Sequence, residues 1–147
     1  MGQRIRYNFN LLLFLTAGIL AMVFSNECAQ AKVKTTIKNG VCIVSGKGAM
    51  TDDYGYNKEI KKVIIKDGVT SLPEEAFTKC RNLKEVSIAD SVKKIGAYAF
   101  MGTDLHKITI PNSVKKLGNS VLSSCKKLTK IKMPGNVKIT YGSDQYY

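Results

Sequence analysis

The chain has 147 residues, 44% of them hydrophobic, with 23 Lys and Arg against 11 Asp and Glu and a single His. This length suits one ordinary domain, and the hydrophobic content argues against a disordered chain. The single histidine excludes a metal site built from several histidines, and the formal charge of +12 directs attention to anionic partners.

The first 31 residues have the pattern of a secretory signal peptide. Arg4 and Arg6 precede an uncharged apolar run at 11–24, and Ala29-Gln30-Ala31 has the small-x-small pattern that signal peptidase cleaves. The run is shorter than the about 20 residues that a membrane-spanning helix needs. The pattern therefore predicts cleavage after Ala31, a secreted or cell-surface protein and no stable membrane span after cleavage. A retained membrane anchor is the alternative.

Residues 32–59 are expected to form an N-terminal cap. Within this segment Val41–Val44 is strand-like, and Gly46, Gly48 and Gly55 indicate turns. The cap would cover the edge of the first repeat, which would otherwise be free to pair with another chain.

An internal repeat with a spacing of 22 or 23 residues fills residues 60–139. Each unit opens with apolar residues at positions one, four and six; the four openings are Ile60–Ile65, Leu83–Ile88, Leu105–Ile110 and Leu128–Met133. This alternation indicates a short strand with one buried face. A single unit cannot bury that face alone, so stacked units must share a continuous core.

The predicted units cover residues 60–82, 83–104, 105–127 and, incompletely, 128–139, with 140–147 as a C-terminal tail or cap. The fold class is a repeat solenoid, mainly β with short helical or turn segments, of about 3.5 units. The turn segments carry the recurring pairs Ala76-Phe77, Ala99-Phe100 and Val121-Leu122. This register predicts that Phe100 lies at the centre of the core, between Phe77 and Leu122.

The repeat resembles leucine-rich repeats, and most closely the BspA-like leucine-rich repeat family of bacterial surface proteins. The resemblance rests on the phrases at 92–100 (VKKIGAYAF) and 110–118 (IPNSVKKLG), and on the preceding segment at 40–50. It implies surface display and adhesion to a matrix or to neighbouring cells. The common leucine-rich unit has Asn or Cys at position nine, whereas this chain has Gly68, Ser91, Ser113 and Asn136. No asparagine ladder is therefore expected.

No constellation of side chains predicts catalysis, a cofactor or a metal site. After signal cleavage the cysteines are Cys42, Cys80 and Cys125. Cys80 and Cys125 share one repeat position two units apart, roughly 10 Å, which exceeds the about 7 Å Cα separation that a disulfide allows. We expect them to be free, packed thiols. His106 is predicted to be solvated on a strand edge, without a partner that would make a nucleophile–base pair.

Lysine is the unusual feature of the repeat, because the same positions recur and form stripes. The candidate partner-binding residues are positions three and five of the openings: Lys62, Ile64, Glu85, Ser87, Lys107, Thr109, Lys130 and Lys132. A second ladder, at Lys93, Lys94, Lys115 and Lys116, is expected on another side of the solenoid. Such stripes are either a solvated face or a surface for an anionic partner.

The leading functional hypothesis is an exported, non-enzymatic module for protein or cell-surface binding. The alternatives are a binder of an anionic glycan or cell-wall polymer, a truncated family fragment without independent function, and a hydrolase of unseen type. Nucleic acid is not an expected partner, because the chain is predicted to be exported and aromatic residues for base stacking are missing among the lysines.

Overall fold

The computed structural model describes residues 32–140 of the protein. The predicted signal peptide at 1–31 lies outside these residues, as does nearly all of the predicted C-terminal tail. Within the described part of the chain, no helix is long or apolar enough to span a membrane.

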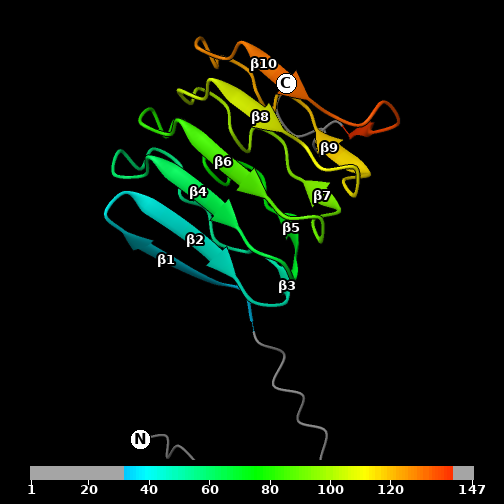
Figure 1. The fold of residues 1–147 in the computed structure, drawn as a ribbon, viewed down its shortest axis with the longest axis horizontal. Coiled ribbons are helices and arrows are strands. Elements are labelled where there is room, and N and C mark those ends of the chain that lie inside the picture. Colours follow the sequence, from blue (N-terminus) through cyan, green and yellow to red (C-terminus); the bar gives the residue numbers. More distant parts are fainter. Residues whose placement is uncertain (1–31, 141–147) are drawn as a thin grey trace, which may run out of the picture.

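The chain winds into a β-solenoid of about five coils, and each coil contributes one strand to each of two faces (Figure 1). On the first face, called the strand face below, lie β2 (Val41–Ser45), β4 (Lys62–Ile65), β6 (Glu85–Ile88), β8 (Lys107–Thr109) and β10 (Lys130–Lys132). On the second face lie β3 (Gly48–Ala49), β5 (Val69–Leu72), β7 (Lys94–Ile95), β9 (Lys116–Gly118) and β11 (Lys138–Thr140).

All pairings between coils are parallel, as winding in one direction requires. The second face is a continuous sheet in the order β11-β9-β7-β5-β3. The strand face consists of two sheets, β1-β2-β4-β6 and β8-β10. At the N-terminal end, β1 (Lys34–Lys38) pairs antiparallel with β2 and covers its outer edge.

The repeat solenoid predicted from the sequence is confirmed, with two differences in detail. Residues 41–59 supply one more coil before Ile60, because β2 pairs with β4 and β3 pairs with β5. The Ala-Phe segments are turns, and no helix occurs within residues 32–140. Glu75 and Lys79 bracket the first of these turns with φ angles of 55° and 52°. Left-handed residues at both ends prevent a right-handed helix from continuing.

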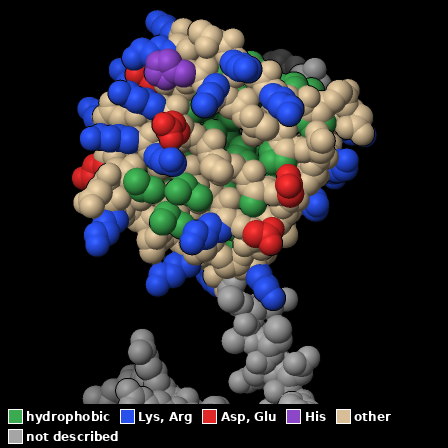
Figure 2. Space-filling model, viewed as in Figure 1, with side chains coloured by type: hydrophobic (Ala, Val, Ile, Leu, Met, Phe, Trp, Pro, Cys, Tyr) green, Lys and Arg blue, Asp and Glu red, His purple; other side chains and the backbone are tan. Residues whose placement is uncertain are grey.

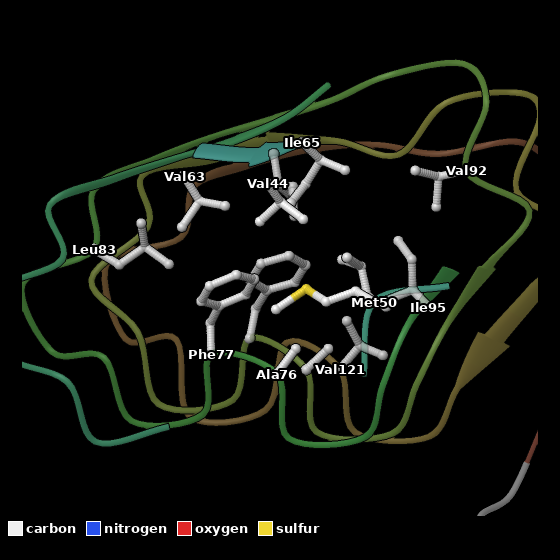
Figure 3. Close-up of a cluster of buried hydrophobic side chains, with 14 of the residues drawn as sticks. Val44, Met50, Val63, Ile65, Ala76, Phe77, Leu83, Val92, Ile95 and Val121 are labelled. Carbon is white, nitrogen blue, oxygen red and sulfur yellow. The ribbon is translucent and has the colours of Figure 1, made fainter. Parts of the chain in front are cut away.

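The core is a column of apolar side chains between the two faces (Figure 3). Phe77 and Phe100 are fully buried, as the repeat register predicts, and Leu122 packs against the same cluster. Tyr54 extends the column into the first coil, because its ring stacks on Phe77 at a centroid distance of 6.2 Å. A sequence position without the Ala-Phe motif thus takes the same place in the stack.

Serine side chains at position nine of the repeat bond to backbone groups at the bend between the two faces. The Ser91 hydroxyl accepts a hydrogen bond from Gly68 N at 3.1 Å and donates one to Val69 O at 2.8 Å. One coil further, Ser113 donates to Val92 O at 2.8 Å. These bonds satisfy backbone groups at the bend that are shielded from water and would otherwise have no hydrogen-bond partner.

The C-terminal end of the stack is open in the described part of the chain. Ile131 in β10 and Met133 just after it are 49% and 43% exposed, whereas Ile108 and Ile110, at the same positions one coil earlier, are each 2% exposed. The difference arises because the coil of β8 lies between the coils of β6 and β10, whereas no coil follows β10 among the described residues.

Candidate partner-binding groove on the strand face

The strand face brings the eight candidate residues together in two rows. Register pairs Lys62 with Glu85 and Ile64 with Ser87 across β4 and β6. It pairs Lys107 with Lys130 and Thr109 with Lys132 across β8 and β10. All eight side chains are exposed or half-buried, because positions three and five alternate with the core positions. The repeat therefore predicts the placement of these residues correctly; their role in binding stays a prediction.

Seven of the eight line one hollow of about 660 Å³, which we call the strand-face groove. Ile64 is the one that does not line it. Three apolar residues that the sequence reasoning did not include complete the lining: Val86, Ile88 and Ile108. Figure 2 shows the hollow with hydrophobic atoms at its bottom and lysine side chains around it.

The groove lies where the strand face is split between β6 and β8. Neighbouring junctions are closed by backbone hydrogen bonds, from Lys84 N to Lys61 O and from Thr129 N to His106 O, both 3.0 Å. Among the described residues no such bond joins His106 N to Lys84 O.

Two features of the sequence coincide with this split. The unit from Leu83 to Leu105 is one residue shorter than its neighbours. In addition, Pro111 stands where Lys66 and Ala89 donate to the preceding coil, with N–O distances of 2.9 and 3.2 Å, and proline has no N–H to donate. Pro134 takes the same repeat position at the paired β8–β10 junction, so only the coincidence of both features marks the split.

The charges of the groove are unevenly distributed. Lys62 forms an ion pair with Glu85 at 3.0 Å. The hydrogen bond from Lys62 and its charge, with a smaller contribution from Lys107, lower the pKa of Glu85 and keep it ionised. Within residues 32–140, no ion pair engages Lys107, Lys130 or Lys132. The half of the groove near β10 is therefore an uncompensated cationic surface.

The second lysine ladder lies on the other face of the solenoid, as expected. Lys94 pairs in register with Lys116 across β7 and β9, and Lys93 and Lys115 precede them. All four side chains are exposed. They have the charge of the groove lysines without its hollow, so they serve as a matched control set.

A second hollow, of about 510 Å³, lies at the turns that follow the Ala-Phe segments. Its lining includes Lys79, Arg81 and Lys126, and the sequence analysis did not identify it. Lys127 and Asp104 form an ion pair of 2.6 Å at this edge, and the Lys79 ammonium lies 5.0 Å from the centre of the Tyr56 ring. These contacts are between neighbouring coils, so they also stabilise the stacking.

Two of the three described thiols, Cys42 and Cys80, are unsuited to nucleophilic chemistry. Cys42 and Cys80 are completely buried, and this burial raises the pKa of each to about 11. Cys80 donates its S–H to Tyr54 O at 3.1 Å, and Cys125 donates to Phe100 O at the same distance. All three cysteines in the described range are free. Cys125 is only partly buried, because the coil beyond it is incomplete.

The described residues of the groove do not form a recognisable catalytic set. His106 is exposed beside the groove, and no hydrogen bond links its ring to a hydroxyl or a carboxylate within residues 32–140. No group of three or more His, Cys, Asp or Glu side chains placed to hold a metal ion occurs in that range.

Comparison with protein families identifies the repeat. The family model described as BspA type leucine rich repeat region matches residues 51–145 in six copies. Curated proteins include no significant match to the chain.

Several solved structures match part of this chain. A leucine-rich repeat protein from Eubacterium ventriosum is 26% identical with a TM-score of 0.50, over 76% of this chain and 42% of that one. The pneumococcal vaccine antigen PcpA is 16% identical with a TM-score of 0.51, over 73% and 37% of the two chains. A leucine rich cell surface protein from Faecalibacterium prausnitzii is 36% identical with a TM-score of 0.48, over 60% and 21%. The chain thus spans less than half of each of these proteins.

Proposed function

This chain belongs to the BspA-type leucine-rich repeat family, and from that premise we propose that it is an exported, non-enzymatic module that binds a protein at a cell surface or matrix. Export is supported by the signal-peptide pattern that ends at Ala31. Among residues 32–140, no nucleophile–base pair lies around the groove, which favours a binding role over catalysis.

One observation carries the proposal: seven of the eight variable positions on the strand face surround a single groove. In repeat proteins the stacked faces form extended binding surfaces, and residues whose side chains do not pack in the core are available for recognition. Positions three and five are such positions here, because they are exposed and the apolar residues that alternate with them build the core.

A second candidate function is the binding of an anionic glycan or cell-wall polymer. It is favoured by the register that places Lys107 beside Lys130 and Thr109 beside Lys132, which gathers three lysines that lack an ion pair in the described residues. A polyanion could follow this surface by charge attraction.

The test compares charge reversal in the groove with charge reversal on the other face. The exported protein is assayed against immobilised matrix proteins and a glycan array. One variant carries Lys107→Glu, Lys130→Glu and Lys132→Glu; its control carries Lys94→Glu, Lys115→Glu and Lys116→Glu, with the same change in net charge. Binding should fall much more in the groove variant than in the control. Raising the salt concentration should weaken binding by the unmodified protein, because salt screens exposed charges. Equal losses would mean diffuse electrostatic attraction, and an unaffected groove variant would place the binding surface elsewhere.

Export is tested separately by N-terminal sequencing of the protein that cells release. We expect a chain that begins at Lys32. A released protein that retains Met1, or one with a lipid on Cys28, would contradict the predicted cleavage.

A further inference from the structure

The strand-face groove combines an apolar floor with a cationic rim, and this combination specifies a partner. We propose that it binds an extended acidic segment of a partner protein, with an apolar side chain in the split between β6 and β8 and a carboxylate at Lys107, Lys130 and Lys132. This inference rests on the proposed function and deepens it, because it names the chemistry of the partner.

The apolar half of the groove arises from the split. Val86 and Ile88 are half-buried in β6, whereas Val63 and Ile65, at the same positions in β4, are 0% and 2% exposed. The two β6 side chains thus keep apolar surface in contact with water inside a hollow. An apolar side chain that fills this space would remove that surface from water, which is favourable.

The floor favours a protein segment over a glycan. Val86, Ile88 and Ile108 offer no side-chain donor or acceptor, so a sugar hydroxyl placed on them would lose its hydrogen bonds to water without replacement. Ser87 and Thr109 are exposed next to the floor and can bond a peptide backbone or a polar side chain. An aliphatic side chain between polar groups matches this arrangement.

The charged half lies one strand further along the stack. Lys107 and Lys130 are register partners, and Lys132 is two residues after Lys130 in β10. Glu85 is occupied by Lys62 on the opposite side of the split. A carboxylate that arrives at the β8–β10 side would therefore meet three ammonium groups. Glu85 is the one carboxylate that lines the groove, and its ion pair is with Lys62, whereas Lys107 contributes least to lowering its pKa.

The spacing of the two halves suits an extended chain that runs across the strands. Neighbouring strands lie about 4.8 Å apart, so the middle of the β6–β8 split is roughly 7 Å from β10 and its lysines. In an extended peptide, residues two apart point to the same side and are separated by about 6.6 Å. The preferred partner sequence therefore has an apolar residue and an acidic residue at i and i+2.

The experiment compares two peptides of identical composition with blocked termini. The first, Thr-Leu-Thr-Glu-Thr-Leu-Thr-Glu, places Leu and Glu on one side of an extended chain. The second, Thr-Leu-Glu-Thr-Thr-Leu-Glu-Thr, places them on opposite sides with the same charge. Fluorescence anisotropy with the purified exported protein should show about tenfold tighter binding of the first peptide, the order of magnitude expected for burying one aliphatic side chain.

A matched pair of variants locates the binding. Thr109→Trp fills the groove without changing the charge and should abolish the preference between the peptides. Thr70→Trp replaces an exposed threonine in β5, on the other face, and should leave the preference intact. Circular dichroism establishes that both variants are folded, and the comparison of peptides on the unmodified protein needs neither variant.

Three results would overturn the inference. Equal affinity of the two peptides would mean that charge alone attracts them. A preference unchanged by Thr109→Trp would place their binding outside the groove. Tighter binding of an oligogalacturonate with the charge of the peptides would identify an anionic glycan as the preferred class of ligand. The proposed binding function would survive each result if the groove charge-reversal variant still lost binding to the matrix panel.

Discussion

Phe77 and Phe100 stack with a ring-centroid distance of 5.7 Å and an angle of 8° between their planes. The two residues hold the same position in neighbouring coils, so the face of one ring lies against the face of the other. Tyr54 continues this stack on the N-terminal side, and Leu122 packs against the core on the other. The aromatic column therefore holds successive coils together at a fixed distance.

The column predicts that Phe100→Ala will be strongly destabilising. Phe100 is fully buried with coils on both sides, so its truncation leaves a cavity that the neighbouring coils cannot fill. The free energy of unfolding should fall by about 3–5 kcal/mol, as is typical for buried phenylalanine. Urea denaturation measures this change, and Leu122→Ala, at a partly buried position, should cost less. An unchanged transition for Phe100→Ala would mean that the repeat register is wrong.

The open end of the stack predicts different costs for the same substitution in successive coils. Ile108 and Ile131 hold the same repeat position and are 2% and 49% exposed. Ile108→Ala should lower the free energy of unfolding by about 2–5 kcal/mol, whereas Ile131→Ala should cost well under half as much. Chemical denaturation of the two variants tests this. Comparable costs would show that Ile131 is covered in solution.

Much of the strand face could be predicted from sequence because its pattern is strict. Apolar residues at positions one, four and six identify the buried side, and the 22- or 23-residue period places Lys62 opposite Glu85 and Lys107 opposite Lys130, as observed. The core position of Phe100 follows from the same register. The family resemblance indicated the fold, and the matching family model confirms it.

The repeat pattern did not predict the exposed floor of the groove or the additional first coil. Val86 and Ile88 occupy core positions in the repeat, so periodicity alone predicts that both are buried; their exposure results from the split beside β6. Tyr54 enters the aromatic column although its segment lacks the Ala-Phe pair. Both features depend on how neighbouring coils meet, which a pattern within one unit does not describe.

Burial of the thiols predicts a pH-dependent pattern of alkylation. The pKa of Cys42 and of Cys80 is raised from 9.0 to about 11, mainly by desolvation, so both remain protonated at pH 8. The thiolate is the reactive form, and Cys125 is the more accessible thiol. Iodoacetamide should therefore modify Cys125 first, which peptide mass spectrometry can resolve.

The same pKa shifts affect stability only in alkaline solution. The unfolded chain loses these thiol protons near pH 9 and the folded chain near pH 11, so their contribution to stability is complete below pH 9 and declines as the pH rises through that window. A Cys42→Ala and Cys80→Ala double variant should show a smaller decline between pH 9 and 11 than the unmodified protein. An identical decline would contradict the proposed burial of the thiols.

Replacing glycine by alanine should affect stability differently at Gly118 and at Gly135. Gly96 and Gly118 have no positive φ, and glycine is required at both positions because the preceding coil lies against them. A Cβ at Gly118 would lie 2.2 Å from Ala97 N, and backbone atoms cannot move aside as a flexible side chain can. Gly118→Ala should therefore force the coils apart and lower the free energy of unfolding by about 1–3 kcal/mol or more, as overpacking does.

The control is Gly135, which has no atom within 4 Å of the added Cβ and no positive φ. Gly135→Ala should leave the stability unchanged or raise it slightly, because alanine reduces the conformational freedom of the unfolded chain. Equilibrium unfolding in urea compares the two variants directly, and similar free energies would show that the close approach of coils at Gly118 does not occur in solution.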